Sequence, residues 1–179
     1  MSTPFLWHHG ATRDAWLIGA AIGLPMSALA AGVTVKIEVP RLKAAEYHKP
    51  YVAVWLEKAN QSVAGNLAIW YEIKSDDGTK YLKDLRQWWR KSGRELAMPV
   101  DGISGATRGP GEYKLAIDAA DGPFGTLPVG QYQLVVEAAR EDGGHELVRV
   151  PFQWPPAATA QSAARGENEL GSVSIELIP

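Results

Sequence analysis

Residues 33–39 read VTVKIEV, and apolar and polar side chains alternate strictly along them. A strand places successive side chains on opposite faces of a sheet, so this pattern predicts a strand with one buried face. Pro40 follows directly and ends the strand, because proline has no backbone N–H to donate to a neighbouring strand. The apolar face of such a strand must pack against a second layer, so we expect a layered β structure.

Further segments carry the same signature of β-branched and aromatic residues bounded by turn-forming residues. They are residues 50–58, 66–74, 112–118, 130–140, 145–154 and 171–179. Turn chemistry lies between them, as in SDDGTK at 75–80 and EDGG at 141–144. About seven short strands are typical of an all-β immunoglobulin/fibronectin type III-like β-sandwich. We expect residues 31–179 to form this single domain, with residues 155–169 as an exposed loop.

A different pattern interrupts the strands at residues 81–93, which read YLKDLRQWWRKSG. Its leucines and Trp89 recur at helical spacing, and Gly93 is a stop signal, so we expect a short amphipathic helical insertion. Trp88 and Trp89 are adjacent, and on a helix their side chains project about 100° apart. Both cannot lie on one narrow buried stripe, so one of them is expected to be partly exposed.

The other tryptophans and the histidines have plain structural explanations. Trp55, Trp70 and Trp154 fall in expected strands, where we expect them to fill the core. His48 and His145 lie in turn-like sequence far apart in the chain, so we expect solvated surface histidines rather than metal ligands. No recognisable catalytic or metal-binding motif is present in the sequence, so neither a catalytic residue nor a metal site is predicted.

Composition and the N-terminal residues bear on location. The 179 residues carry a formal net charge of −2, which gives no support to a nucleic-acid partner, and the absence of cysteine excludes disulfides. An apolar run at residues 15–24 is followed by SALAAG, with Ala28 and Ala30 at the positions that a signal peptidase reads. We expect residues 1–30 to be a cleaved signal peptide, with no stable membrane insertion afterwards. An uncleaved membrane anchor is the alternative.

The loop at residues 100–111, VDGISGATRGPG, contains the pattern Asp-x-x-Ser-Gly-Ala-Thr. This pattern resembles the site at which a periplasmic flavin transferase attaches FMN, through its phosphate, to the last threonine. The corresponding residues are Asp101, Ser104, Gly105, Ala106 and Thr107. Such sites occur in subunits of sodium-pumping quinone reductases and in other extracytoplasmic electron carriers. The resemblance therefore implies a covalent FMN cofactor on Thr107, in agreement with export.

The chemistry of the loop suits an acceptor role. Its glycines and Ala106 leave clearance around the threonine hydroxyl, which must enter the active site of another enzyme. This hydroxyl is not acidic by itself, so the transferase must supply the activating group. We expect Arg108 or backbone N–H groups to hold the attached phosphate, and Trp88 or Trp89 to offer an aromatic surface to the flavin ring.

The mature chain also resembles a bacterial family of predicted periplasmic proteins, domain of unknown function 2271 (DUF2271). The likeness is carried by YVAVWLEKANQ, KYLKDLRQWWR, DGISGATRGPGEYKLAID, YQLVVEAARE and ARGENELGSVSIEL, which together cover most of residues 51–177. This resemblance implies flavinylation and a membrane-bound reductase as a partner, beside the flavin transferase. The expected function is a periplasmic electron-transfer protein rather than an enzyme with a substrate of its own.

Three other interpretations stay open. A cofactor-free fibronectin-like binding module in the periplasm is supported by the expected fold alone, and a fold does not determine a function. An exported hydrolase with Ser104 or Thr107 as nucleophile lacks both the strand–turn–helix motif of such enzymes and an identifiable base. The loop is also compatible with a plain connection that carries two solvated hydroxyls.

Overall fold

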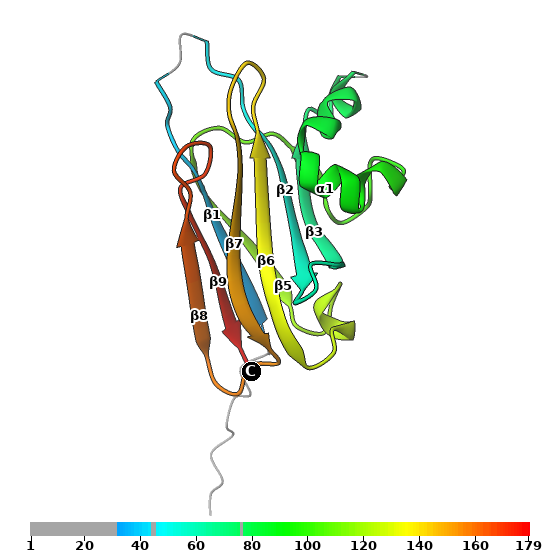
Figure 1. Ribbon diagram of the computed structural model, residues 1–179, viewed down its shortest axis with the longest axis vertical. Coiled ribbons are helices and arrows are strands. Elements are labelled where there is room, and N and C mark those ends of the chain that lie inside the picture. The colour runs from blue at the N-terminus through cyan, green and yellow to red at the C-terminus, as the bar shows by residue number, and fades with distance from the viewer. Residues whose placement is uncertain (1–31, 44–45, 76) are drawn as a thin grey trace, which may run out of the picture.

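The computed structural model describes residues 32–43, 46–75 and 77–179 (Figure 1). The expected signal peptide, residues 1–30, lies outside the described residues. In the described part, nine strands form a four-stranded sheet in the order β5-β1-β9-β8 and a five-stranded sheet in the order β4-β3-β2-β6-β7. The strands are β1 (Gly32–Val39), β2 (Tyr51–Lys58), β3 (Val63–Tyr71), β4 (Ser104–Ala106), β5 (Gly111–Asp118), β6 (Gly130–Ala139), β7 (His145–Trp154), β8 (Ala160–Arg165) and β9 (Ser172–Ile178).

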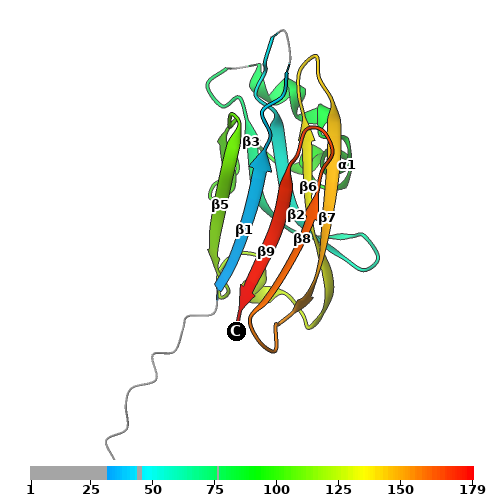
Figure 2. The ribbon, with the colours of Figure 1, turned by 90° about the vertical axis from the view of Figure 1, so that its left-hand side faces the viewer.

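The four-stranded sheet contains the alternating segment of the sequence as β1. This strand pairs antiparallel with β5 on one side and with β9 on the other (Figure 2). Its apolar residues Val33, Val35, Ile37 and Val39 are buried, and the residues between them are half-buried. The prediction of a strand with one buried face is therefore confirmed.

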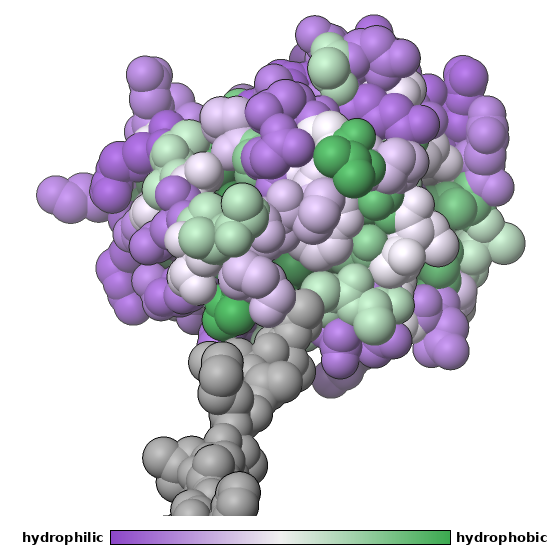
Figure 3. Space-filling model, turned by 90° about the horizontal axis from the view of Figure 1, so that it is seen from below, coloured by the Kyte–Doolittle hydropathy of each residue, from purple (hydrophilic) through white to green (hydrophobic). Residues whose placement is uncertain are grey.

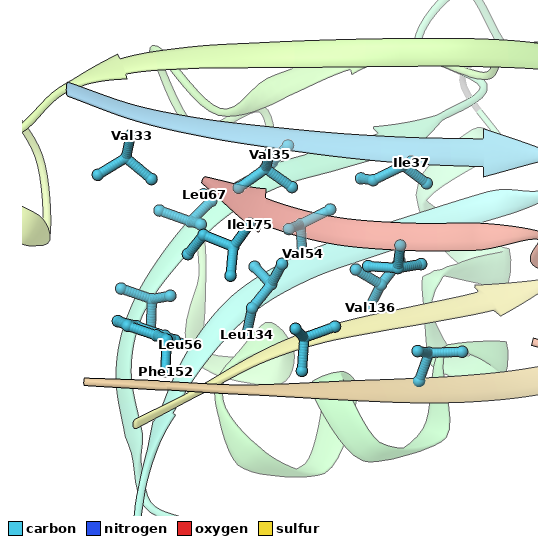
Figure 4. Packing of buried hydrophobic residues seen from close by; sticks show 14 of the residues in the cluster. Val33, Val35, Ile37, Val54, Leu56, Leu67, Leu134, Val136, Phe152 and Ile175 are labelled. Carbon is cyan, nitrogen blue, oxygen red and sulfur yellow. The ribbon is translucent and has the colours of Figure 1, made fainter. Parts of the chain in front are cut away.

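One apolar core lies between the two sheets, and side chains from both sheets point into it (Figure 4). Ile175 of β9 and Val54 of β2 belong to the same cluster of buried residues, although they come from opposite sheets. Trp70 and Trp154 also belong to this cluster, which confirms that they fill the core. The two sheets thus stabilise each other by burying one face apiece.

The five-stranded sheet buries its outer face as well, under a helical insertion. This insertion consists of η1 (Gly78–Asp84), α1 (Arg86–Lys91) and η2 (Gly93–Glu95), where η denotes a 3₁₀ helix. It forms a second buried cluster with the sheet, to which Trp55, Ile69, Leu82, Leu85 and Trp88 contribute. The predicted helical insertion is confirmed, and Trp55 is buried as expected, although on the outer face of its sheet.

Trp88 and Trp89 differ as their separation around the helix predicts. Trp88 is fully buried and Trp89 is partly exposed. The ring of Trp88 packs against Gly93, where an added Cβ would lie 2.5 Å from a ring carbon. Gly93 follows the end of α1 at Lys91, and its lack of a side chain makes room for this tryptophan ring.

Buried glutamates of the sheet hold both ends of α1. The Glu137 carboxylate of β6 accepts hydrogen bonds from the backbone N–H groups of Gln87 at 2.9 Å and Trp88 at 2.8 Å. These donors belong to the first turn of the helix, which has no side-chain cap of its own. At the other end, Lys91 Nζ lies 2.6 Å from Glu57 Oε1 of β2. The helix is therefore fastened to the sheet by groups distant in sequence.

The all-β class is confirmed, and two short strands correct the expected layout. β4 lies inside the segment expected to be a loop, and β8 lies inside residues 155–169, which were expected to be an exposed loop. Neither strand is rich in β-branched residues, since they read SGA and AQSAAR. Both lie at the edges of their sheets, where one neighbouring strand supplies the hydrogen bonds. Pairing, rather than local propensity, makes them strands.

Seen from below, the described residues present apolar areas that are divided by hydrophilic residues (Figure 3). At the opposite end, the β1–β2 connection, the β6–β7 turn and the helical insertion come together (Figure 1). Thr107 lies among these segments.

Candidate functional site

The segment that precedes Thr107 is a hydrogen-bonded turn. Ser104 N–H donates to the Val100 carbonyl at 3.0 Å, and the Ser104 hydroxyl accepts the Val100 N–H at 2.9 Å. Asp101 Oδ1 accepts the N–H of Gly102 at 3.0 Å, and Gly102 has a φ of +76°, a conformation that favours glycine. Asp101 and Ser104 therefore shape the backbone, and the serine hydroxyl is already engaged there.

The next residues form an edge strand. Gly105 and Ala106 pair in parallel with Trp70 and Tyr71 of β3, and Thr107 N–H donates to the Tyr71 carbonyl at 3.1 Å. A Cβ on Gly105 would lie 3.5 Å from the Trp70 ring, which is ordinary contact. Within the described residues, the Thr107 hydroxyl forms no hydrogen bond to another group. The backbone of this tetrapeptide is thus fixed while its last hydroxyl remains available.

Arg108 turns towards an aromatic pair. Its guanidinium carbon lies 4.1 Å from the centre of the Trp70 ring and 4.9 Å from that of Tyr113. The Tyr113 hydroxyl in turn donates to the Gly109 carbonyl at 2.7 Å. This cation–π contact stabilises the chain just after Thr107.

Thr107 lines a surface hollow of about 430 Å³, which lies within the range of small-molecule sites. Its walls come from the connection before β2, the segment after β3, η1 and the β6–β7 turn. The remaining lining residues are Tyr47, His48, Lys49, Tyr51, Glu72, Ser75, Gly78, Tyr81, Asp84, Ala139, Arg140 and Glu141. Segments from four parts of the chain therefore meet around Thr107.

The hollow carries both signs of charge. Arg140 is held by Glu169 through two contacts, of 2.9 and 3.0 Å. His48 Nδ1 lies 3.6 Å from Glu141 Oε2. Among the described residues, Lys49 is the lining cation that forms no ion pair with a carboxylate. A negative group attached at Thr107 would thus meet a lysine in the same hollow.

Tyrosines supply its aromatic surface. Burial is the main cause that raises the pKa of Tyr47 and of Tyr51 above the ordinary value, so both phenols keep their protons at neutral pH. The Tyr51 hydroxyl donates to the Gly78 carbonyl at 3.0 Å, which ties β2 to η1. Tyr81 is 46% exposed, so close to half of this side chain's surface is open to solvent.

The tryptophans expected to face the flavin ring do not line this hollow. Trp88 has no exposed surface, and its Nε1 donates to Asn66 Oδ1 at 2.9 Å. Trp89 lines a separate hollow together with Arg86 and His145. The structure therefore corrects the placement of Trp88, because a fully buried ring cannot offer a face to a cofactor, and gives Trp89 a different neighbourhood from Thr107.

Arg108 is likewise absent from the residues that line the hollow, although it follows Thr107 directly. The tyrosines and Lys49 that do line it were not selected from the sequence. Tyr47, Lys49 and Tyr51 share one sequence signal, the cluster YHKPY at residues 47–51, whereas Tyr81 lies at the start of the helical segment YLKDLRQWWRKSG. Residues close to Thr107 in the sequence, such as Arg108 and Trp89, therefore do not line its hollow.

The histidines occupy partly exposed positions. His48 is 32% exposed and lies beside two carboxylates, and His145 Nε2 is 2.5 Å from the buried Glu137 Oε1. His145 thus has a structural partner as well as solvent contact. In the described ranges, no three His, Asp or Glu side chains are grouped closely enough to hold a metal ion.

Comparison of the sequence with known protein families gives a match. The family described as “Predicted periplasmic protein (DUF2271)” matches residues 32–172. The chain belongs to this family. In the DUF2271 chain, the match includes β1 to β8 and every residue of the motif from Asp101 to Thr107. No curated protein and no solved structure matches the chain.

The family description assigns DUF2271 proteins to the periplasm by prediction. In the part of the chain that the structure describes, no helix combines the length and the apolar character needed to span a bilayer.

Proposed function

We propose that this DUF2271 protein carries FMN in a phosphoester bond to Thr107 and transfers electrons in the periplasm. The observation that carries the proposal is the position of Thr107 at the hollow, directly after a hydrogen-bonded turn. The other hydroxyl of the motif, on Ser104, already accepts a hydrogen bond within that turn. The sequence pattern and the periplasmic description of the family support the same function.

Access to the acceptor supports modification by a second enzyme. Positions Gly102 and Gly109 have no atom within 4 Å of an added Cβ, so open space surrounds both. Ala106 is exposed and Thr107 is half-buried. A flavin transferase would thus find a small, open approach to the hydroxyl. In the proposed step the threonine oxygen bonds to the FMN phosphorus of a flavin dinucleotide, the phosphoanhydride bond to the nucleotide half breaks, and a nucleoside monophosphate leaves. The hydroxyl proton passes to a base of the transferase.

The residues of the hollow fit FMN. A space of about 430 Å³ is of the right order for a small cofactor, and it combines aromatic rings with side chains of both charges. Tyr81, Tyr47 and Lys49 are the residues that would hold the group. When bound, FMN would supply the redox chemistry, and the protein would position it and tune its potential. A membrane-bound reductase is the proposed electron donor.

An immunoglobulin or fibronectin type III-like arrangement is the finer fold assignment that we propose for the two sheets, on the strength of their antiparallel pairs. The alternative function, a cofactor-free binding module of this type, rests on that fold alone. It does not require a modified Thr107.

Replacing Thr107 by Ala should abolish flavin attachment, because the acceptor oxygen is gone. The protein is produced in the periplasm together with an active flavin transferase, and its intact mass is measured. The wild type should be yellow and heavier than the unmodified chain by one FMN minus one water, whereas the variant should be colourless and unmodified. Thr126→Ala, which removes an exposed threonine outside the motif, is the control and should remain fully modified. A colourless, unmodified wild type would refute the proposal and favour the binding module.

A further inference from the structure

The hollow beside Thr107 contains an exposed aromatic ring on a fixed support. Tyr81 is 46% exposed, whereas the next residue, Leu82, is fully buried beneath the insertion. The Tyr51–Gly78 hydrogen bond fastens the start of η1 to β2. The Tyr81 hydroxyl has no hydrogen-bond partner among the described residues. An exposed aromatic ring on the wall of a concave site is a surface for a planar ligand.

We propose that the isoalloxazine of the FMN on Thr107 binds within this hollow, against Tyr81, and not against Trp88 or Trp89. This inference rests on the proposed function, and it names the residues that hold the ring. Thr107 and Tyr81 line the same hollow, whereas Trp89 lines a different one. Trp88 is excluded because its side chain is fully buried.

The other tyrosines have supporting roles in this site. Tyr51 uses its hydroxyl to hold η1, and its ring lies edge-on to Tyr71 at 6.4 Å between centres. Tyr47 lies near Arg140, whose guanidinium carbon is 6.0 Å from the centre of the tyrosine ring. Both rings are half-buried, so they shape the hollow and leave Tyr81 as its most open aromatic face.

The covalent bond to Thr107 allows the flavin ring to occupy a site that has only low intrinsic affinity for it. Binding of a tethered group is intramolecular, and a short tether gives an effective concentration of about 1 mM or more. A hollow too open to capture dilute FMN can therefore hold the attached ring. Lys49 in the same hollow favours the negatively charged phosphate.

The test compares variants that all carry FMN by intact mass. A flavin ring held in one orientation shows visible circular dichroism, and contact with a tyrosine quenches its fluorescence. The loaded wild type should show both signals. Tyr81→Ala should lose them and approach the signals of free FMN, whereas Tyr81→Phe should keep the dichroism because it keeps the ring. Trp89→Ala, which removes a partly exposed aromatic residue from the same insertion, is the matched control and should match the wild type.

The thermal midpoint of Tyr81→Ala should stay near that of the wild type, because much of the ring is exposed. The inference is wrong if loaded wild type resembles free FMN, or if Trp89→Ala changes the flavin signals and Tyr81→Ala does not. Absence of FMN from the wild-type mass is a different result, since it refutes the proposed function and removes the basis of this inference.

Discussion

Replacing Trp88 by Ala is expected to lower the free energy of unfolding by about 3–5 kcal/mol, the usual cost of removing a fully buried tryptophan. The ring fills the space between the five-stranded sheet and the insertion, where it belongs to the cluster with Trp55 and Leu85. Its Nε1 donates to Asn66, and its face packs on Gly93. Alanine leaves a cavity in this cluster and removes the indole N–H that donates to Asn66, and both effects lower the stability. Urea unfolding of purified protein measures the change.

Trp89→Ala provides the matched control for this prediction. Trp89 is also a tryptophan and is the next residue of the same helix, but its side chain is partly exposed. We expect a loss of at most about 1 kcal/mol, typical of a surface substitution. Equal losses in the two variants would contradict the buried role of Trp88.

The strands that could be predicted are those whose side chains alternate or are rich in β-branched residues. In β1 the period of two matches one buried face, and in β6 the apolar run matches burial on both faces. The segments AQSAAR and SGA carry neither signal, yet β9 and β3 provide hydrogen-bond partners for them. Short edge strands of small residues depend on their neighbours, which a local pattern does not contain.

The candidate site divides in the same way. The motif around Thr107 is contiguous, so its turn and its acceptor could be proposed from a dozen residues. The hollow is assembled from residues 47–51, 72–84 and 139–141, which only the folded sheet brings together. Trp88 and Trp89 lie near Thr107 in sequence, which made them the expected aromatic surface for the flavin ring. In the structure Trp88 is fully buried and Trp89 lines a separate hollow.

The anchoring of α1 connects stability to the proposed site. Tyr81 belongs to η1, which runs directly into α1, and α1 is held at its start by Glu137 and at its end by Glu57. Glu57 also accepts a hydrogen bond from Trp55 Nε1 at 3.1 Å. The two carboxylates therefore fix the insertion that presents Tyr81, although neither of them lines the hollow.

Replacing Glu137 by Ala should lower the free energy of unfolding by at least about 1–3 kcal/mol, because two backbone donors lose their acceptor and one of them is buried, where an unmade hydrogen bond costs this much. The donors are the N–H groups of Gln87 and Trp88 in the first turn of α1. The helix should open locally before the sheet unfolds, which makes the peptide bonds after the already exposed Lys83 and Arg86 accessible to trypsin. Urea unfolding measures the global loss, and the rate of tryptic cleavage within the insertion measures the local one.

Two controls separate this anchoring from other roles of the carboxylate. His145→Ala removes the imidazole beside Glu137 but keeps both backbone hydrogen bonds, so it should cost less than Glu137→Ala. Glu112→Ala removes an exposed glutamate from β5 and should change stability by no more than about 0.5 kcal/mol. If Glu137→Ala is no worse than His145→Ala and leaves tryptic cleavage unchanged, the helix does not depend on this carboxylate. If the anchoring is correct, loaded Glu137→Ala should also lose part of its flavin dichroism, because Tyr81 rests on the loosened insertion.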